Sequence, residues 1–461
     1  MRATSHSARM LLVFALVALS VLAASAWLGA GESRAGSGSR AILWKHVLNP
    51  TSGGDGLWQC APAPGGGVYA CGTTGWIYED LTSTDVWVVR YKANGKQAWS
   101  RTWNGPDGRA EDMNAMVADA TGDVYVAGAT VRATGDRDTV LLKYLPDGTL
   151  AWATVYPASA GEDEAESVGL DGSGHVYVGG SLSVGGNGNA FVARFSCATG
   201  VRDWTAVYDS GDYDWGWRLA VTRAGESYVC GQTKTTLTGY DGLLVKVTAD
   251  GVVAWARATS GRGAGDEYWD TVTPARGGGV LLAGEMNGTA DSSEVAVARY
   301  SRGGARSWLK VWAPPGGGRA YVNGAALAKD GGLWVTGEVS RSGGADDRGF
   351  LGRWSAGGAR RFAHVIGTKS HQVRYYDVQL DGAGNAYVAG AALASATGWD
   401  ALLAKYSQSG ALLRRKTTSF GGKHDDEFDR ACLGPSGSIY AVGLGAEDTP
   451  DSSGVVARIR R

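Results

Sequence analysis

Acidic residues recur at one position of an internal sequence repeat. This acid position lies seventeen residues before a glycine that ends a phrase of the type YVAG, and six of its eight copies carry Asp or Glu. The other two copies carry Ala320 and Val373. Carboxylates accept hydrogen bonds from sugar hydroxyls and bind cations, so a ring of them is a candidate binding site. The six acidic residues are Asp55, Glu111, Asp163, Asp214, Glu267 and Asp426.

The residues around the acid position divide the repeats into two groups. Repeats 2, 3 and 8 add acidic residues, whereas repeats 4 to 7 add aromatic ones. We therefore predict a channel mouth with an acidic half and an aromatic half, whose aromatic side chains are partly exposed and stack on a ligand. The alternative is that the acids cap turns and the aromatics fill space between structural elements. The predicted ligand-binding residues are Asp163, Asp214, Trp215, Trp217, Glu267, Tyr268, Trp269 and Asp426. The same stretches also contain Asp112, Glu162, Glu164, Glu166, Asp425, Glu427 and Asp429, and the aromatic residues Tyr213, Tyr321, Tyr375 and Tyr376.

Two classes of function fit such a mouth. The first is a binding or scaffold protein that captures a sugar, a peptide or a cation. The second is an enzyme, in which a carboxyl pair such as Glu164 and Asp426 acts as acid and base in glycan cleavage, or in which a quinone lies over the mouth. The first class is favoured, because the sequence contains no G-x-S-x-G or Walker-type phrase in a strand-turn-helix context.

Cysteine and histidine residues give weaker signals. The five cysteines are an odd number, and Cys60 and Cys71 flank a hairpin turn at which a disulfide is one interpretation. The other is that Cys71 and Cys230, which share a repeat position, are small buried apolar residues. The phrase at 212–217, DYDWGW, matches a calcium loop only in part, so no cofactor is firmly implied and calcium stays open. No zinc-ligand spacing relates His46, His175, His371 and His424.

The elements that position these side chains repeat eight times. The glycine that ends each phrase, here called the phrase glycine, recurs with a mean period of 53 residues, from Gly72 to Gly443. Each period holds four runs of strand-forming residues, and a turn of the DGSG type joins the first two. A period of this length indicates a repeat architecture rather than a series of unrelated domains.

The third run of each repeat ends in a basic residue followed by an aromatic or aliphatic one. The basic residue is present in all eight copies, and such uniformity favours a solvated or bridging structural role over a local site. These residues are Arg90, Lys143, Arg194, Lys246, Arg299, Arg353, Lys405 and Arg458.

The fourth run has the pattern G-x-x-x-W and predicts how the chain closes. Phe362 replaces Trp in one copy, Arg414 breaks the pattern in the next, and the C-terminal copy lacks the run. Trp44 stands before every other element, so the segment 41–47 should complete the blade built by 427–461. The sequence therefore predicts an all-β, eight-bladed β-propeller of four-stranded antiparallel blades. A parallel β-helix is the alternative, but its coils are shorter than this period.

Two resemblances support this architecture. The phrases GNAYVAG (384–390), DALLAKY (400–406) and GTLAW (148–152) resemble bacterial β-propeller repeats, mostly exported and of unassigned function. The phrase TGVRDW (199–204) is similar to the tryptophan-docking motif of eight-bladed quinoprotein dehydrogenases (PQQ-like repeats), in which a Trp packs between blades. The quinoprotein resemblance implies a structural device more than a catalytic one, because the adjacent cysteine pair and the calcium-binding constellation of those enzymes are not found.

The N-terminal segment is typical of an export signal. Arg2 and Arg9 precede an apolar run, and small residues at 24–26 fit cleavage after Ala26. The predicted divisions are a signal peptide (1–26), a flexible lead-in (27–40) and one propeller domain (41–461), in a secreted or cell-surface protein. The alternative is an uncleaved membrane anchor. The net charge of −1 argues against nucleic acid as a partner, so we expect an extracellular small molecule, a glycan or a protein.

Overall fold

The computed structural model describes residues 42–460 with short gaps. The gaps are 52, 77–83, 157–160, 185, 237–238, 263–264, 290–291, 342–345, 395–397, 422–423, 436 and 447–451. The predicted signal peptide and lead-in lie outside the described residues. Within the described part, no helix is long and apolar enough to cross a membrane.

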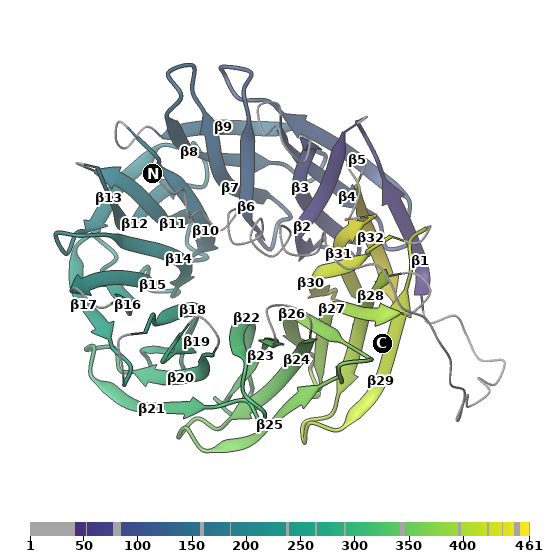
Figure 1. Ribbon diagram of the computed structural model, residues 1–461. Coiled ribbons are helices and arrows are strands. Elements are labelled where there is room, and N and C mark those ends of the chain that lie inside the picture. Colours follow the sequence, from purple (N-terminus) through teal and green to yellow (C-terminus); the bar gives the residue numbers. More distant parts are fainter. Residues whose placement is uncertain are drawn as a thin grey trace.

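Thirty-two strands form eight four-stranded antiparallel sheets, arranged as blades around a central opening (Figure 1). This confirms the predicted eight-bladed propeller. Blade 1 comprises β2 to β5, the next blades follow in chain order, and blade 8 comprises β30, β31, β32 and β1. The innermost strands are β2 (Gly54–Pro62), β6 (Glu111–Ala118), β10 (Glu164–Leu170), β14 (Asp214–Val221), β18 (Tyr268–Pro274), β22 (Arg319–Leu327), β26 (Val373–Leu380) and β30 (Glu427–Leu433). The second strands are β3 (Val68–Trp76), β7 (Val124–Val131), β11 (His175–Val184), β15 (Ser227–Thr236), β19 (Val280–Met286), β23 (Leu333–Arg341), β27 (Ala386–Ala394) and β31 (Ile439–Gly445). The third strands are β4 (Asp85–Tyr91), β8 (Arg137–Tyr144), β12 (Asn187–Ser196), β16 (Gly239–Val247), β20 (Glu294–Tyr300), β24 (Asp346–Trp354), β28 (Gly398–Tyr406) and β32 (Ser453–Ile459). The outermost strands are β5 (Gln97–Trp103), β9 (Leu150–Tyr156), β13 (Arg202–Tyr208), β17 (Val253–Thr259), β21 (Arg306–Trp312), β25 (Arg360–Ile366), β29 (Leu412–Thr418) and β1 (Ile42–Leu48).

The N-terminal strand closes the ring. β1 pairs antiparallel with β32, with Trp44 opposite Arg458, so the first described strand is the outermost strand of the last blade. β1 covers the edge of β32 that would otherwise be unpaired, which explains why the C-terminal repeat can lack a fourth strand of its own. The predicted role of Trp44 is confirmed.

Each innermost strand carries a β-bulge opposite the phrase glycine. In β10 the pairing steps from Ala165 to Ser167, so Glu166 is the extra residue. A Cβ added at Gly180 would lie 1.9 Å from the carbonyl oxygen of Glu164, and the other phrase glycines give 1.8 to 2.1 Å. Glycine recurs there because the bulged strand comes too close for any side chain. The bulge residues are Trp58, Asn114, Glu166, Trp217, Asp270, Asn323, Tyr376 and Asp429.

The apolar core lies between neighbouring blades. One cluster joins Tyr69 and Val88 of blade 1 to Met113 and Leu142 of blade 2, and seven similar clusters join the other pairs. Each blade therefore buries both of its faces, which is why its strands read as almost continuous apolar runs.

A shared carbonyl group links neighbouring blades at the outer strands. The indole N–H of Trp99 donates to Pro146 O (2.9 Å), and the Arg90 guanidinium donates to the same oxygen. The Trp99 ring lies on Gly148, where a Cβ would come within 2.8 Å of Cδ2. This confirms a bridging role for the basic residues and explains the glycine of the G-x-x-x-W pattern. The same double contact occurs at Ala93, Cys197, Ala249, Arg302 and Ala356.

Candidate functional site

The carboxylates at the acid position are buried and hold the loops of the fold together. All six side chains are 0 to 1 % exposed. In Asp426, one carboxylate oxygen accepts from Phe420 N (2.9 Å) and the other from Ala446 N (3.1 Å). The backbone N–H of Asp426 donates to Trp399 O of blade 7, so this residue ties two loops of blade 8 to the preceding blade.

The other acid positions repeat this arrangement. Asp214 accepts from Ser210 N (2.6 Å) and from Thr233 Oγ1 (2.5 Å), and Glu267 accepts from Asn287 N (3.2 Å). Asp163 accepts from Ser183 N (3.2 Å). The prediction that Asp163, Asp214, Glu267 and Asp426 face a ligand at an open mouth is therefore corrected. Backbone and hydroxyl donors offset part of the cost of burying these carboxyl groups, so the six residues hold loops of the propeller together.

Blade 6, which has Ala320 at the acid position, is linked to blade 5 through a serine hydroxyl. The backbone N–H of Ala320 donates to Ser293 Oγ (2.9 Å), and the Ser293 hydroxyl donates to Ala320 O (2.8 Å). The Ser293 hydroxyl, just before β20 of blade 5, thus takes the place of the backbone carbonyl that accepts from the acid-position N–H in other blades, for example Thr84 O from Glu111 N.

A pH-dependent stability is expected from Glu111. Burial raises the pKa of this carboxyl to about 7, although Thr130 Oγ1 donates to it at 3.0 Å. Because the folded-state pKa exceeds the unfolded one, the contribution of Glu111 to stability is complete below about pH 4.5 and is lost as the pH rises through 7. We expect wild type to lose about 2–3 kcal/mol more unfolding free energy than Glu111→Gln between pH 4.5 and 8, measured by urea denaturation. Parallel pH profiles of the two proteins would contradict this assignment.

The predicted exposure of the aromatic half is wrong for three of the four residues named. Trp217, Tyr268 and Trp269 are 5, 7 and 0 % exposed, and only Trp215 is half-buried. Trp269 follows Tyr268 directly, so the strand pleat turns it into the core, where it packs on Gly242. The rings of Trp217 and Tyr268 contact each other at 5.5 Å. Packing therefore accounts for most of this aromatic cluster.

The residue directly after the acid position is acidic in some blades and aromatic in others, as the sequence predicted for the two halves of the mouth. The next residue in each strand, such as Leu57 or Met113, belongs to a core cluster on one face of its blade, so alternation places this position on the other face of the innermost strand. We call these eight residues the channel ring. Blades 2, 3 and 8 contribute carboxylates to it, and blades 4 to 6 contribute aromatic rings. The channel ring consists of Gly56, Asp112, Glu164, Trp215, Tyr268, Tyr321, Arg374 and Glu427.

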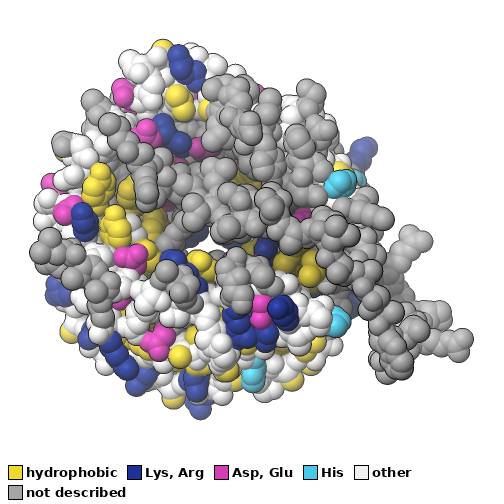
Figure 2. Space-filling view, in the orientation of Figure 1, with side chains coloured by type: hydrophobic (Ala, Val, Ile, Leu, Met, Phe, Trp, Pro, Cys, Tyr) yellow, Lys and Arg dark blue, Asp and Glu magenta, His cyan; other side chains and the backbone are white. Residues whose placement is uncertain are grey.

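Arginine residues that sequence reasoning missed lie among these carboxylates. Arg137 Nη2 lies 2.5 Å from Asp112 Oδ2 and 3.4 Å from Glu164 Oε1. Burial lowers the pKa of Arg218 in blade 4, and the positive charge of Arg430 in blade 8 lowers it further. Blades 4 and 8 lie opposite each other in the ring, so this repulsion acts across the central opening. Figure 2 shows charged and hydrophobic side chains bordering the central opening.

The channel wall keeps an excess of carboxyl groups over guanidinium groups. Burial raises the pKa of Glu166 and Asp429 well above the usual range, and Glu164 and Glu427 raise these values further. Among the described residues, none donates a hydrogen bond to Glu166 Oε1 or to Asp429 Oδ2. None of them accepts a hydrogen bond from Trp215 Nε1. Six carboxyl groups of the channel ring and the bulge residues stand against four guanidinium groups: Asp112, Glu164, Glu166, Asp270, Glu427 and Asp429 against Arg137, Arg218, Arg374 and Arg430.

The remaining candidate chemistry is not assembled into a site. All five cysteines are free, and Cys60 and Cys71 pair with Ala70 and Gln59 rather than with each other. Within the described ranges, no three His, Cys, Asp or Glu side chains are grouped to hold a metal ion. The acid–base pair Glu164 and Asp426 is not available as predicted, because Asp426 is engaged by two loop amides.

Comparisons with known proteins show the fold alone. No protein-family model matches this chain, and no curated protein matches it. The structure of Chaetomium thermophilum Sqt1 bound to the N-terminus of the ribosomal protein L10 has a TM-score of 0.55 and 11 % identity, covering 90 % of this chain and 98 % of that one. Sqt1 of the same organism without that partner gives 0.55 and 10 %, covering 92 % and 98 %. The resemblance to bacterial propeller repeats stays a prediction.

Proposed function

We propose that this protein is a binding or scaffold propeller that receives a cationic group of a peptide partner at its central channel. The observation that carries the proposal is the pair of buried carboxylate oxygens, Glu166 Oε1 and Asp429 Oδ2, that have no donor among the described residues. A lysine or arginine side chain would supply the missing N–H donors, and its positive charge would lower the raised pKa values of these two carboxyl groups, so that they bind it in the ionised form. A cation also matches the excess of carboxyl groups in the wall.

The aromatic half of the channel ring supports the same ligand. Trp215 is half-buried, and the neighbouring Tyr213 is 38 % exposed. The faces of aromatic rings attract cations and cover the apolar stem of a lysine or arginine side chain. A site with carboxylates on one side and aromatic rings on the other therefore suits a long basic side chain better than a bare metal ion.

The comparison with Sqt1 adds support for a protein partner. That protein is described with the N-terminus of another protein bound to it. An eight-bladed ring offers the same kind of platform here, and loops on a rigid scaffold commonly carry binding residues. The proposed setting is outside the cytoplasm, because the N-terminal sequence is typical of an export signal, and the partner is then an extracellular or cell-surface protein.

Titration with octalysine tests the proposal. Tryptophan fluorescence of the full chain should report saturable binding that weakens with salt. The double substitution Glu166→Gln with Asp429→Asn should lower the affinity by about tenfold or more, since charge-assisted hydrogen bonds are lost. Asp147→Asn is the matched control, because Asp147 is an exposed carboxylate in the turn after β8, at the opposite end of the strands from the acid position.

A glycan and a metal ion are the alternative ligands to be tested. Cellohexaose and calcium should produce no saturable response under the same conditions. A response to either of these, without one to octalysine, would replace the proposed partner by a glycan or a metal ion. Equal affinity of octalysine for wild type and for the double variant would remove the carboxylates from the site.

A further inference from the structure

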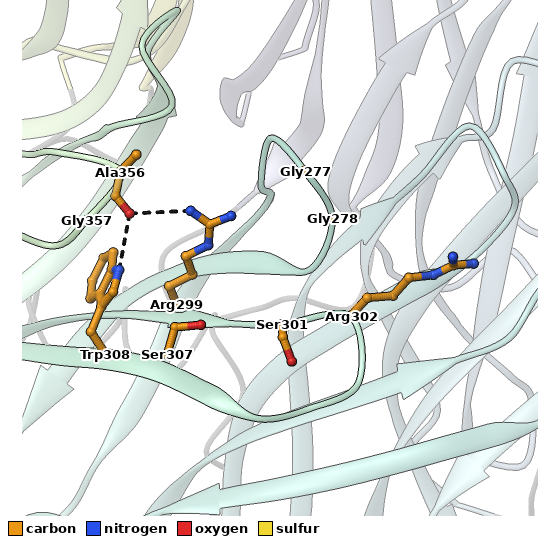
Figure 3. A pocket seen from close by; sticks show the side chains of 9 residues that line it. All are labelled: Gly277, Gly278, Arg299, Ser301, Arg302, Ser307, Trp308, Ala356 and Gly357. Carbon is orange, nitrogen blue, oxygen red and sulfur yellow. Dashed lines mark hydrogen bonds between the residues drawn. The ribbon is translucent and has the colours of Figure 1, made fainter.

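A cavity of about 350 Å³ lies between blades 5 and 6, next to Arg299 (Figure 3). It is bordered by the turn that joins β18 to β19 and by the turns that follow β20 and β24. These turns lie at the opposite ends of the strands from the acid position, so the cavity is separate from the channel mouth. No acidic residue lines it. The lining residues are Gly277, Gly278, Arg299, Ser301, Arg302, Ser307, Trp308, Ala356 and Gly357.

Arg299 lacks the aromatic partner that its equivalents have. The basic residue of the third strand pairs across the sheet with a residue of the second strand, which is Tyr or Trp in seven blades and Leu281 in blade 5. In six of those blades the cation lies 5.0 to 5.9 Å from the centre of that ring, and Arg194 lies 5.5 Å from Trp204 instead. The leucine side chain therefore offers Arg299 no aromatic face at the position where the other blades place a ring.

Arg299 also lacks a carboxylate partner. In five other blades the equivalent basic side chain pairs with an acid, for example Lys246 with Glu226 at 2.7 Å and Arg353 with Asp330 at 2.7 Å. Arg90 and Arg458 have no such acid, but each lies over a tyrosine ring. Of the eight equivalents, all within the described residues, Arg299 alone has neither contact.

The turn beside Arg299 explains the missing acid. Gly277, Gly278 and Gly279 all have positive φ, from 74° to 94°. A Cβ at Gly279 would lie 2.0 Å from the carbonyl oxygen of Tyr300, so the position that carries Glu226 in blade 4 admits only glycine in blade 5. Arg299 is left with two neutral acceptors, Arg276 O at 3.0 Å and Ala356 O at 3.4 Å.

We propose that this cavity binds a small organic anion through Arg299, with a carboxylate or phosphate group of the ligand in the place of the absent acid. A guanidinium has five N–H donors and binds such oxyanions in a forked geometry, and two carbonyl contacts leave donors available. Arg302 is occupied elsewhere, because Glu226 accepts from its Nε at 2.9 Å, and its side chain runs away from Arg299 (Figure 3).

The remaining lining fits a compact ligand. Trp308 donates its indole N–H to Ala356 O (3.2 Å), which fixes the ring at the wall of the cavity. Its face gives an apolar surface for the non-anionic part of the ligand, and Ser301 and Ser307 contribute hydroxyl groups. The volume is at the lower end of the range for small-molecule sites, which begins at about 300 Å³.

Isothermal titration calorimetry with inorganic phosphate and with acetate, at constant ionic strength, tests the proposal. Wild type should bind at least one of the two saturably. In Gly277→Asp the new carboxylate should occupy the site, because a Cβ at Gly277 lies 4.0 Å from Arg299 Nη2, and affinity should fall about tenfold or more. Gly277→Asn carries the same backbone strain without the charge and should bind within about threefold of wild type.

A second variant changes a residue outside the β18–β19 turn, so its result does not depend on strain at Gly277. Leu281→Tyr restores the residue type of the other blades, so its ring should engage Arg299 as the rings of the other blades engage their basic residues, and anion affinity should fall about tenfold or more. Because Leu281 is 1 % exposed, the larger side chain should also lower the melting temperature, so binding is compared at a temperature at which both proteins are folded. Binding of phosphate alone or of acetate alone supports the proposal and assigns the ligand class. Absence of saturable binding to wild type, or equal binding by Gly277→Asp and Gly277→Asn, would overturn it.

Discussion

A chain that lacks Ile42–Leu48 is expected to lose about 5 kcal/mol or more of unfolding free energy and to associate through the edge that this exposes. β1 is the outermost strand of blade 8, so its removal leaves β32 unpaired along one side. The Trp44 indole donates to Ala93 O at 3.0 Å, and the His46 ring stacks on Tyr91 at 4.8 Å. Both partners belong to blade 1.

The same strand also reaches the preceding blade. Lys45 Nζ donates to Ser419 O at 2.6 Å and lies 4.8 Å from the centre of the Phe420 ring. Both residues lie in the segment that follows β29 of blade 7. β1 therefore connects three blades, and its loss removes contacts on both sides of the closing blade as well as its own pairing.

Guanidinium denaturation and size-exclusion chromatography measure these two effects. The control is a chain that lacks residues 1–41 and begins at Ile42. It keeps the strand and should match the full chain in both measurements. A monomeric protein of unchanged stability after deletion of Ile42–Leu48 would show that the ring holds without this strand.

The architecture was predictable because repetition makes local signals redundant. Gly95 with Trp99, and Gly148 with Trp152, are recognised from sequence as a recurring pair, and the structure shows Trp99 of one blade packed on Gly148 of the next. Trp44 could be placed because a strand was missing at one terminus and present at the other. Such inferences need only the period, which eight phrase glycines define, and a pattern that most of the repeats share.

The exposure of the side chains at the candidate mouth could not be predicted from the sequence, because a shift of one residue along a strand moves a side chain to the opposite face. A bulge at Asp270 and the pleat direct Tyr268 and its neighbour Trp269 to opposite sides of β18, although they are adjacent in sequence. The partners of Asp426 are the amides of Phe420 and Ala446, and a backbone amide leaves no side-chain signal. Arg137 reaches the carboxylates from the third strand of blade 2, a distance along the chain that no local pattern spans.

The substitution Trp99→Ala is expected to cost about 3–5 kcal/mol of unfolding free energy, as the loss of a large buried side chain does. Trp99 is 6 % exposed, and its ring lies 5.9 Å from that of Tyr69 and 6.2 Å from that of Tyr144. Its indole N–H also donates to Pro146 O. Trp99→Phe is the control: blade 6 naturally carries Phe362 over Gly410, so this variant should lose about 1–2 kcal/mol, chiefly the hydrogen bond.

A double-mutant cycle with Gly148 separates packing against the glycine from general burial. Gly148→Ala should cost about 2 kcal/mol or more, because φ is +87° and the new Cβ would come within 2.8 Å of the Trp99 ring. In the Trp99→Ala background the ring is gone and only the backbone strain remains, so the second substitution should cost about 1–2 kcal/mol. The two losses are therefore expected to be less than additive, measured from urea denaturation midpoints of the four proteins. Additive losses would mean that Trp99 does not pack on Gly148. The recurrence of Gly and Trp in the G-x-x-x-W pattern would then not be explained by a contact between neighbouring blades.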